Sequence, residues 1–239
     1  MTKSIKIIIQ HFLNKFGYKI EKNFECRKHD FSIKGLQNLG EINTIIDVGV
    51  NQGTPSLYKA FENCNIVLVD PLLDYNKEVI SEIEKQFKNV FLIPKGAGCK
   101  KETLNFNINK TSLGRSSMLK RTSITESKNP LYENIRVKSD RLDIMIKELN
   151  LPGPFGIKID TEGYEMNVLN GSVKLFNDTK FIITETSMAK RFEGSYFFEE
   201  LIDFMKHNNF RAYDIFDISR SDDVGTKYLD IAFIRVNKN

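Results

Sequence analysis

The sequence predicts an α/β domain with a mostly parallel seven-stranded sheet, one reversed strand and helices on both faces. Short runs of β-branched and other apolar residues end in turn residues, as strands buried on both faces do. Segments with helical periodicity separate these runs. Near the C-terminus, two strands are joined by a polar loop too short for a helix, which implies antiparallel pairing and puts the reversed strand at the end of the sheet.

The first half of the chain supplies three strands and the helices between them. The strands are expected at 44–49, 66–70 and 90–93, and the helices at 54–61 and 76–87. Pro55 stands in the first turn of the first helix, where its missing amide hydrogen costs least. Pro71 ends the second strand, and the third runs into a glycine-rich turn at 95–98.

The second half begins less regularly. Residues 104–108 alternate apolar and polar side chains, which is typical of a half-exposed strand. Residues 109–130 are rich in Thr, Ser, Lys and Arg without periodicity, and long segments of this kind are commonly lids, binding loops or disordered. The regular pattern then resumes, with helices at 141–149, 164–169 and 196–207 and strands at 156–160, 181–185, 211–216 and 228–236.

The domain plan places an N-terminal helix and lead-in, residues 1–40, on the core of one domain formed by residues 41–239. At helical spacing one apolar face of the first segment contains Ile5, Ile8, Ile9, Phe12, Leu13 and Phe16. We expect this face to dock on its own domain. Two alternatives stay open: contact with a membrane surface, or pairing with a second subunit as a homodimer.

Composition narrows the class of protein. Hydrophobic residues make up 41% and charged residues 28%, as in soluble enzymes. A net charge of +4 is too small to predict nucleic-acid binding, and no apolar stretch approaches the roughly 20 residues of a membrane span. The three cysteines are far apart and odd in number, without disulfide or zinc spacing, so a cytoplasmic location is expected.

Distinctive residues follow the first two strands, at the edge where doubly wound sheets bind ligands. Gly49 and Gly53 allow a tight turn and the close approach of a flat ligand, without the pattern of a dinucleotide or P-loop site. Asp70 stands where a carboxylate accepts hydrogen bonds from both ribose hydroxyls. Asp47 can attract an ammonium group. Alternatively, Asp47 pins a loop or pairs with Lys158, and Asp70 only closes a turn.

Two blocks of sequence resemble known methyltransferases. IDVGVNQG at 46–53 resembles the first motif of Rossmann-fold methyltransferases. KIDTEGYE at 158–165, followed by VLNG at 168–171, resembles the signature of the FkbM family. The likeness spans about 45–185. It implies a Rossmann-like class I methyltransferase fold and O-methyl transfer from S-adenosylmethionine to a hydroxyl of a sugar, glycan or related natural product, as in glycan biosynthesis.

The resemblance also assigns residues to the cofactor. By position, the cofactor loop consists of Asp47, Gly49, Asn51 and Gly53. Asp70 stands where the family more often has Glu, and its shorter side chain still reaches the ribose. Ala97 falls where backbone near the adenine is expected.

Methyl transfer to a hydroxyl requires an acceptor for its proton, and a positioned base contributes typically 10²–10⁴-fold. Asp160, after a central strand, is the first choice for that base, and Glu162 is the second. We expect no metal; in the rival arrangement a divalent cation is held by Asp160, Glu162 and Glu185. Lys158 is expected to neutralise Asp47, and Glu165 to be a solvated helix residue.

Acceptor recognition is expected in the segment 109–130. Arg115, with Lys120 and Arg121, can grip a phosphate or carboxylate. Ser116 and Ser117 can bind cofactor or sugar hydroxyls, and Glu185 completes the predicted acceptor site. The alternative is a solvated loop without a ligand.

The predicted partner is therefore a small molecule or glycan bearing a hydroxyl. Two other functions were weighed. An NAD-dependent sugar-modifying oxidoreductase needs a glycine-rich dinucleotide turn and a Tyr-x-x-x-Lys acid, and neither is evident. A non-catalytic nucleoside-binding module leaves the carboxylates at three strand ends without a use.

Overall fold

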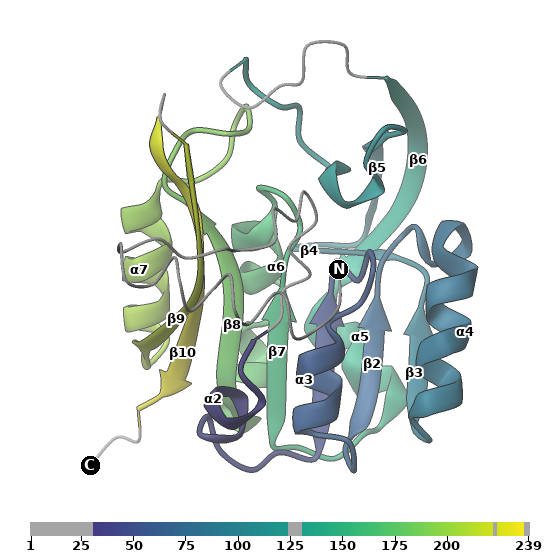
Figure 1. The fold of residues 1–239 in the computed structure, drawn as a ribbon, viewed down its shortest axis with the longest axis vertical. Helices are drawn as coiled ribbons and strands as arrows, with labels where there is room; N and C mark the ends of the chain where they lie inside the picture. The colour runs from purple at the N-terminus through teal and green to yellow at the C-terminus, as the bar shows by residue number, and fades with distance from the viewer. Residues whose placement is uncertain (1–30, 124–130, 222–223, 237–239) are drawn as a thin grey trace, which may run out of the picture.

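The computed structural model describes residues 31–123, 131–221 and 224–236 of the chain (Figure 1). The predicted N-terminal helix lies outside these ranges, as does the last part of the 109–130 segment. The described part of the lead-in contains helix α2 (Ile33–Gln37), whose Leu36 is fully buried against the domain. No helix in the described ranges has the length and hydropathy needed to cross a membrane.

A seven-stranded sheet forms the centre of the domain, in the order β3-β2-β1-β7-β8-β10-β9. Its first five strands are parallel, and β10 runs antiparallel to both of its neighbours. The bounds are β1 (Thr44–Val48), β2 (Asn65–Val69), β3 (Val90–Ile93), β7 (Phe155–Ile159), β8 (Thr179–Ser187), β9 (Phe210–Ser221) and β10 (Gly225–Arg235).

The predicted seven strands and single reversed strand are confirmed, but the reversed strand lies inside the sheet rather than at its end. After β8 the chain passes through α7 and forms β9 at the edge of the sheet, one strand position away from β8. The β9–β10 hairpin then brings the chain back, and β10 fills the position between β8 and β9.

Helices cover both faces of this sheet (Figure 1). Side chains alternate along each strand, so Ile45 and Ile46 of β1 belong to different hydrophobic clusters. The cluster of Ile45 contains residues of α2, α3 (Pro55–Ala60) and α4 (Lys77–Gln86). The cluster of Ile46 contains residues of α5 (Leu142–Leu149), α6 (Glu165–Asn170) and α7 (Phe198–His207).

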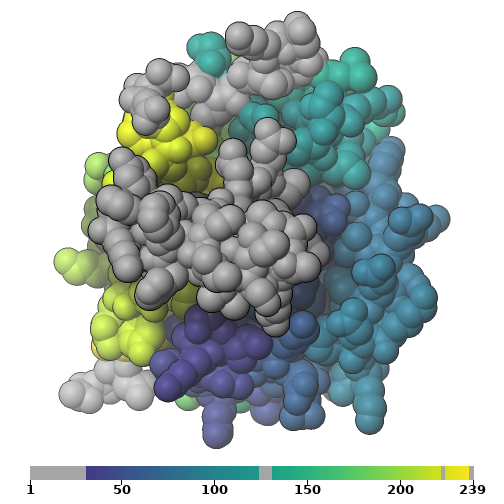
Figure 2. All heavy atoms as spheres, in the orientation of Figure 1, coloured from purple at the N-terminus to yellow at the C-terminus, as the bar shows by residue number. Residues whose placement is uncertain are grey.

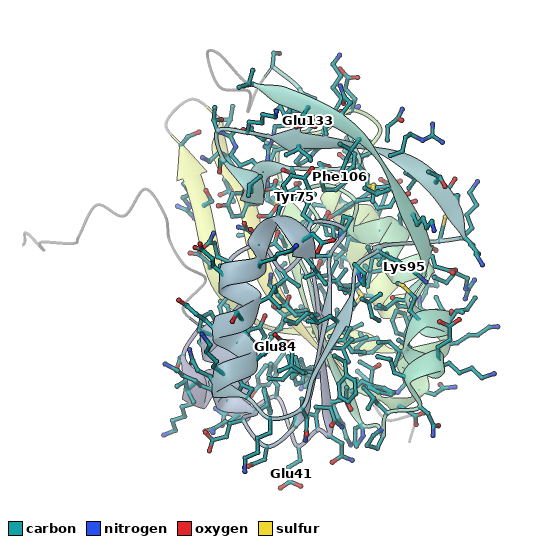
Figure 3. All side chains as sticks on the ribbon, turned by 90° about the vertical axis from the view of Figure 1, so that its right-hand side faces the viewer. Glu41, Tyr75, Glu84, Lys95, Phe106 and Glu133 are labelled. Atoms are coloured by element: carbon teal, nitrogen blue, oxygen red, sulfur yellow. The ribbon has the colours of Figure 1, made fainter. Side chains whose placement is uncertain are left out.

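A second sheet of three strands, in the order β4-β6-β5, extends beyond the carboxyl ends of the main sheet. Its strands are β4 (Gly96–Gly98), β5 (Glu102–Asn109) and β6 (Tyr132–Arg141). In the side view Glu41, just before β1, and Glu133 on β6 mark opposite ends of the molecule (Figure 3). In the space-filling view the teal atoms of this sheet lie above the blue atoms of α4 (Figure 2).

The sequence predicted only part of this second sheet. Residues 104–108 are indeed a strand, but β4 falls in the expected turn and β6 was not predicted at all. Charged side chains occupy many positions of β6, and most of its residues are exposed or half-buried, so its apolar alternation is weak. Within 109–123 the chain forms a 3₁₀ helix, η2 (Leu113–Arg115), and two isolated bridges to other segments.

Candidate active site at the carboxyl ends of the strands

A cavity lies at the carboxyl ends of β1, β2 and β7, between the main sheet and the second sheet; its empty space of about 570 Å³ includes solvent at its mouth. This is the edge at which doubly wound sheets bind their ligands. The cavity wall contains many of the sequence-predicted site residues, namely Gly49, Asn51, Asp70, Ala97, Ser116, Asp160 and Glu162. Asp47, Gly53, Arg115, Ser117 and Glu185 do not line it.

The turn after β1 packs backbone to backbone on the turn after β7. Gly49 has φ +83°, and a Cβ placed there would stand 1.8 Å from the carbonyl oxygen of Asp160. The amide of Asp160 donates to the carbonyl of Val48 at 2.9 Å. Gly49 therefore fixes the backbone of Asp160. Gly53, with φ +74°, faces Ile83 and Tyr58, so its role is in the turn rather than in the cavity wall.

Asp47 lies beneath the cavity and is fully buried. Its Oδ2 accepts hydrogen bonds from the hydroxyls of Thr54, at 3.0 Å, and Tyr58. The Nζ of Lys158 stands 3.7 Å from Oδ1, so the expected neutralisation of Asp47 across adjacent strands is present. Burial raises the pKa of Asp47 against the lowering effect of Lys158. The cofactor contact through this carboxylate stays a prediction; Asp47 is not among the residues that line the cavity.

Asp70 follows β2 and lines the cavity while being 8% exposed. Backbone amides fix its orientation: Leu72 donates to Oδ1 at 2.7 Å and Asn51 to Oδ2 at 3.3 Å. Burial raises the pKa of Asp70, and these amide bonds oppose the shift. Each carboxylate oxygen has a further lone pair, so both can still accept from a ligand.

Asp160 lines the cavity at the end of β7 and pairs with Lys158, whose Nζ lies 3.2 Å from Oδ2. Burial disfavours the Lys158 ammonium, but the carboxylates of Asp160 and Asp47 outweigh that effect and raise its pKa. One buried ammonium therefore joins the cavity wall to its floor.

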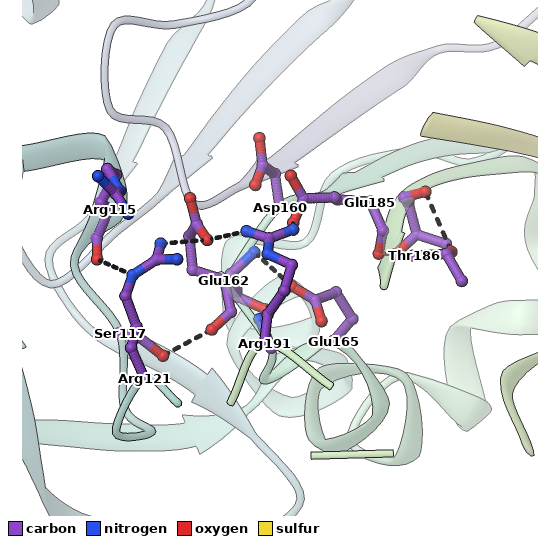
Figure 4. Close-up of polar contacts among 12 residues, drawn as sticks. Arg115, Ser117, Arg121, Asp160, Glu162, Glu165, Glu185, Thr186 and Arg191 are labelled. Carbon is purple, nitrogen blue, oxygen red and sulfur yellow. Dashed lines mark hydrogen bonds and ion pairs between the residues drawn. The ribbon is translucent and has the colours of Figure 1, made fainter. Parts of the chain in front are cut away.

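Glu162 lies in a network of buried arginines (Figure 4). Its Oε2 accepts from Nη2 of Arg121, at 2.7 Å, and from Nη2 of Arg191. The other end of the Arg191 guanidinium donates to Glu185, which is 4% exposed. Burial raises the pKa of Glu185, and Arg191 opposes that shift. Glu162 has φ +52°, a backbone conformation that is costly for a non-glycine residue and is held here by these contacts.

Glu165 is 1% exposed, so the expectation of a solvated helix residue was wrong. It is the first residue of α6, and its carboxylate turns back to satisfy the amides of the preceding loop. Its Oε1 accepts from the amides of Thr161, at 3.0 Å, and Gly163, at 2.9 Å, and its Oε2 from the hydroxyl of Tyr196 at 2.9 Å. Burial raises the pKa of Glu165 to about 7.

The serines predicted to bind ligands are both engaged within the protein. Ser116 lines the cavity, and its Oγ accepts from the amide of Asn109 at 3.0 Å. Ser117 is 2% exposed; its hydroxyl donates to the carbonyl of Glu162 at 2.6 Å and accepts from the amide of Leu119 at 2.9 Å. These bonds tie the segment after β5 to the loop after β7.

The carboxylates proposed as alternative metal ligands are separated by guanidinium groups. Glu162 and Glu185 both bind Arg191, and Asp160 binds Lys158. In the described ranges no three His, Cys, Asp or Glu side chains are arranged to hold a metal ion.

Sequence reasoning missed Tyr58, Arg191 and Tyr196, whose side chains complete the charged network. Arg191 lies 29 positions after Glu162 and in a loop, so no local periodicity connects them. Its place just beyond the end of β8 was the one available signal, because residues beyond the carboxyl ends of central strands face the ligand edge.

Comparison with known proteins finds a matching family model, Methyltransferase FkbM domain, over residues 47–212. No curated protein sequence matches the chain. Among solved structures, the FkbM methyltransferase of Methylobacillus flagellatus KT is 14% identical with a TM-score of 0.47; the match covers 79% of this chain and 43% of that one. This chain thus spans less than half the length of that relative.

Two further structures show similar likeness. The magnesium protoporphyrin IX methyltransferase of Synechocystis PCC 6803, with bound S-adenosylmethionine, is 10% identical with a TM-score of 0.46, covering 97% of each chain. The fibrillarin of Aeropyrum pernix, in complex with S-adenosylmethionine, is 10% identical with a TM-score of 0.45, covering 82% of this chain and 68% of that one.

The order and direction of the strands confirm the predicted Rossmann-like fold, and the family model covers well over half of the sequence. This chain belongs to the FkbM methyltransferase family.

Proposed function

We propose that the protein is an S-adenosylmethionine-dependent O-methyltransferase acting on a hydroxyl of a sugar, glycan or related natural product. The observation that carries the proposal is the shared cavity of Asp70 and Asp160, at the carboxyl ends of β2 and β7 with the Gly49 turn between them. A ribose-binding carboxylate and a candidate base thus border one space.

The residues of the cavity suit the cofactor. Asp70 is placed to accept from the ribose hydroxyls. Leu72, Phe106, Leu113 and Met118 supply apolar wall for a flat base. Asp160 and Glu162 supply negative charge to the cavity wall, which suits a cationic ligand. When bound, S-adenosylmethionine supplies a methyl group on a positively charged sulfur.

The reaction needs a base beside the acceptor oxygen. Asp160 would accept the hydroxyl proton as the methyl group passes from the sulfonium of the bound cofactor to the acceptor oxygen. The products are S-adenosylhomocysteine and a methyl ether. Glu162 is the weaker candidate for this role, because two guanidinium groups already bind its Oε2.

The test is Asp160→Asn, with the exposed Asp178→Asn as matched control. Methyl transfer is followed by mass spectrometry of sugar-nucleotide and glycan libraries, as a gain of one methylene unit. We expect Asp160→Asn to abolish transfer while S-adenosylhomocysteine affinity stays within about tenfold, since the variant removes a base and not a ribose contact. Comparable turnover in variant and wild type would move the role to Glu162 or to a metal.

Calorimetry separates the other functions. Binding of NAD but not S-adenosylmethionine would refute the methyltransferase, and binding of neither would refute every cofactor-dependent function considered above. Binding of S-adenosylmethionine without transfer to any member of the libraries would favour the binding module.

A further inference from the structure

A second cavity lies on the other side of the segment that closes the cofactor cavity; its empty space of about 730 Å³ includes solvent at its mouth. Side chains alternate along residues 116–119 of this segment. Ser116 and Met118 line the first cavity. Ser117 and Leu119 line the second. This is the two-residue period of an extended chain, so one stretch of backbone forms the wall between two binding spaces.

The wall is held in place by backbone pairing. Asn107 of β5 and Ser117 exchange hydrogen bonds at 2.8 and 3.1 Å. At its far end Arg121 bridges to Phe192, and its guanidinium lies 4.6 Å from the centre of that ring. The second cavity therefore has an ordered wall within the described residues.

The same pairing builds a polar surface on the second sheet. Asn107 of β5 and Asn134 of β6 stand directly opposite each other in register, and Tyr132 lies two residues from Asn134 on the same face. All three line the second cavity. The amide nitrogen of Asn107 donates to the carbonyls of Ser117 and Leu119, both at 3.2 Å, so its oxygen is the group that can accept from a sugar hydroxyl. Asn134 adds a second amide, which has both a donor and an acceptor, and Tyr132 adds an aromatic surface and a hydroxyl.

Positive charge borders this polar surface. Arg115, Lys120 and Arg121 line the cavity, and no carboxylate belongs to the described residues that line it. Lys120 pairs with Glu193 at 3.1 Å, but both side chains are more than half exposed, so this ion pair is weak and can exchange for a ligand. Guanidinium groups present a fork of donors to carboxylate or phosphate.

Arg121 connects the two cavities. It lines the second one, while its Nη2 contacts Glu162, which lines the first beside Asp160. A ligand on the polar surface would thus have its charged group near the arginines and the rest of its length directed along the wall that borders the methyl-donor site.

We propose that the second cavity binds the anionic end of the methyl acceptor, a carbohydrate carrying a carboxylate or a phosphate whose reacting hydroxyl reaches Asp160 in the first cavity. This rests on the methyltransferase function proposed above. The chemistry of the second cavity distinguishes an anionic sugar from a neutral one, because cationic side chains line it together with amide and phenol groups.

The test uses the full chain and three probes built on one sugar: glucose, glucuronate and glucose 6-phosphate. Binding is measured by calorimetry with and without saturating S-adenosylhomocysteine. In the wild type the better anionic probe should bind at least about tenfold more tightly than glucose, the effect of one charge-assisted hydrogen bond. Glucuronate against glucose 6-phosphate decides between carboxylate and phosphate.

Arg115→Ala should reduce this preference to within about threefold. Lys110→Ala is the matched control, because Lys110 pairs with Glu133 near the same strands but does not line the cavity; it should keep the preference. Unchanged S-adenosylhomocysteine affinity shows that each variant is folded. Absent binding, equal affinity for all three probes, a preference that survives Arg115→Ala, or equal losses in both variants would each overturn the proposal. Failure of the wild type to bind S-adenosylhomocysteine refutes the methyltransferase instead.

Discussion

Replacing Glu165 by Gln should make the protein more stable at neutral pH and change how stability depends on pH. Burial raises the pKa of Glu165 from 4.5 to about 7, so the folded state holds a proton that the unfolded state releases. The stabilising effect of that proton is complete below pH 4.5 and is lost as pH rises through about 7. A shift of about 2.5 units corresponds to about 3 kcal/mol. Gln keeps the shape without the charge.

The free energy of unfolding should therefore rise in Glu165→Gln relative to wild type by about 3 kcal/mol between pH 4.5 and pH 8. In this size range that is about 6–12 °C in melting temperature. Urea unfolding at several pH values measures the difference in free energy of unfolding between variant and wild type. The contributions of the other buried carboxylates cancel in this difference. The exposed Glu148→Gln serves as control and should follow the wild type. If the free energy of unfolding depended on pH in the same way in Glu165→Gln and in the wild type, the claim that Glu165 holds a proton in the folded state would be refuted.

Three further predictions test the site. Gly49→Ala puts a methyl group 1.8 Å from a backbone carbonyl oxygen, whereas Gly194→Ala, also at positive φ, meets open space. Thermal unfolding should show a loss of about 1–2 kcal/mol in the control and at least twice that in Gly49→Ala; equal losses would contradict the close packing. Arg191→Met removes the partner of the buried Glu185 carboxylate. The free energy of unfolding, measured with urea at pH 8, should fall by about 3–5 kcal/mol, and by less at acidic pH. An unchanged urea midpoint would contradict the network. Asp70→Ala should weaken S-adenosylhomocysteine binding about tenfold or more by calorimetry, and the exposed Asp74→Ala should not; equal affinities would exclude the ribose contact.

The central sheet was predictable because its strands are buried on both faces. Runs such as 44–48 and 65–69 are mostly apolar and are followed by Gly or Asp-Pro, so burial and turn chemistry agree locally. The second sheet lacks that agreement. β6 carries charges at alternate positions and needs β5 and β4 for its hydrogen bonds, and pairing between distant segments leaves little trace in a single strand.

The candidate site also has a part that the sequence predicts and a part that it does not. Gly49, Asp70 and Asp160 directly follow strands, so topology alone brings them to one edge. Burial does not follow from position: Glu165 is charged and begins a helix, features typical of solvent-exposed residues, yet its carboxylate is enclosed by the loop that it caps. Arg191 joins the site only through contacts with residues distant in sequence.

The balance of charge around the cavity is the strongest physical link between this network and its ligand. Buried carboxylates need partners, and those described here share a smaller number of cations. The carboxylates are Asp47, Asp160, Glu162, Glu165, Glu185 and Asp230, and the cations that face them are Lys158, Arg121 and Arg191. Burial raises the pKa values of Asp47, Glu165 and Glu185, and the excess of negative charge from neighbouring carboxylates raises them further. A positively charged ligand in the cavity would relieve that excess, so its binding should lower these pKa values and release protons.

Calorimetry of S-adenosylmethionine in buffers of different ionisation enthalpy measures that release, and S-adenosylhomocysteine, which lacks the sulfonium charge, should release fewer protons. Equal release by the two ligands would mean that the carboxylates serve the fold and do not sense the charge of the cofactor.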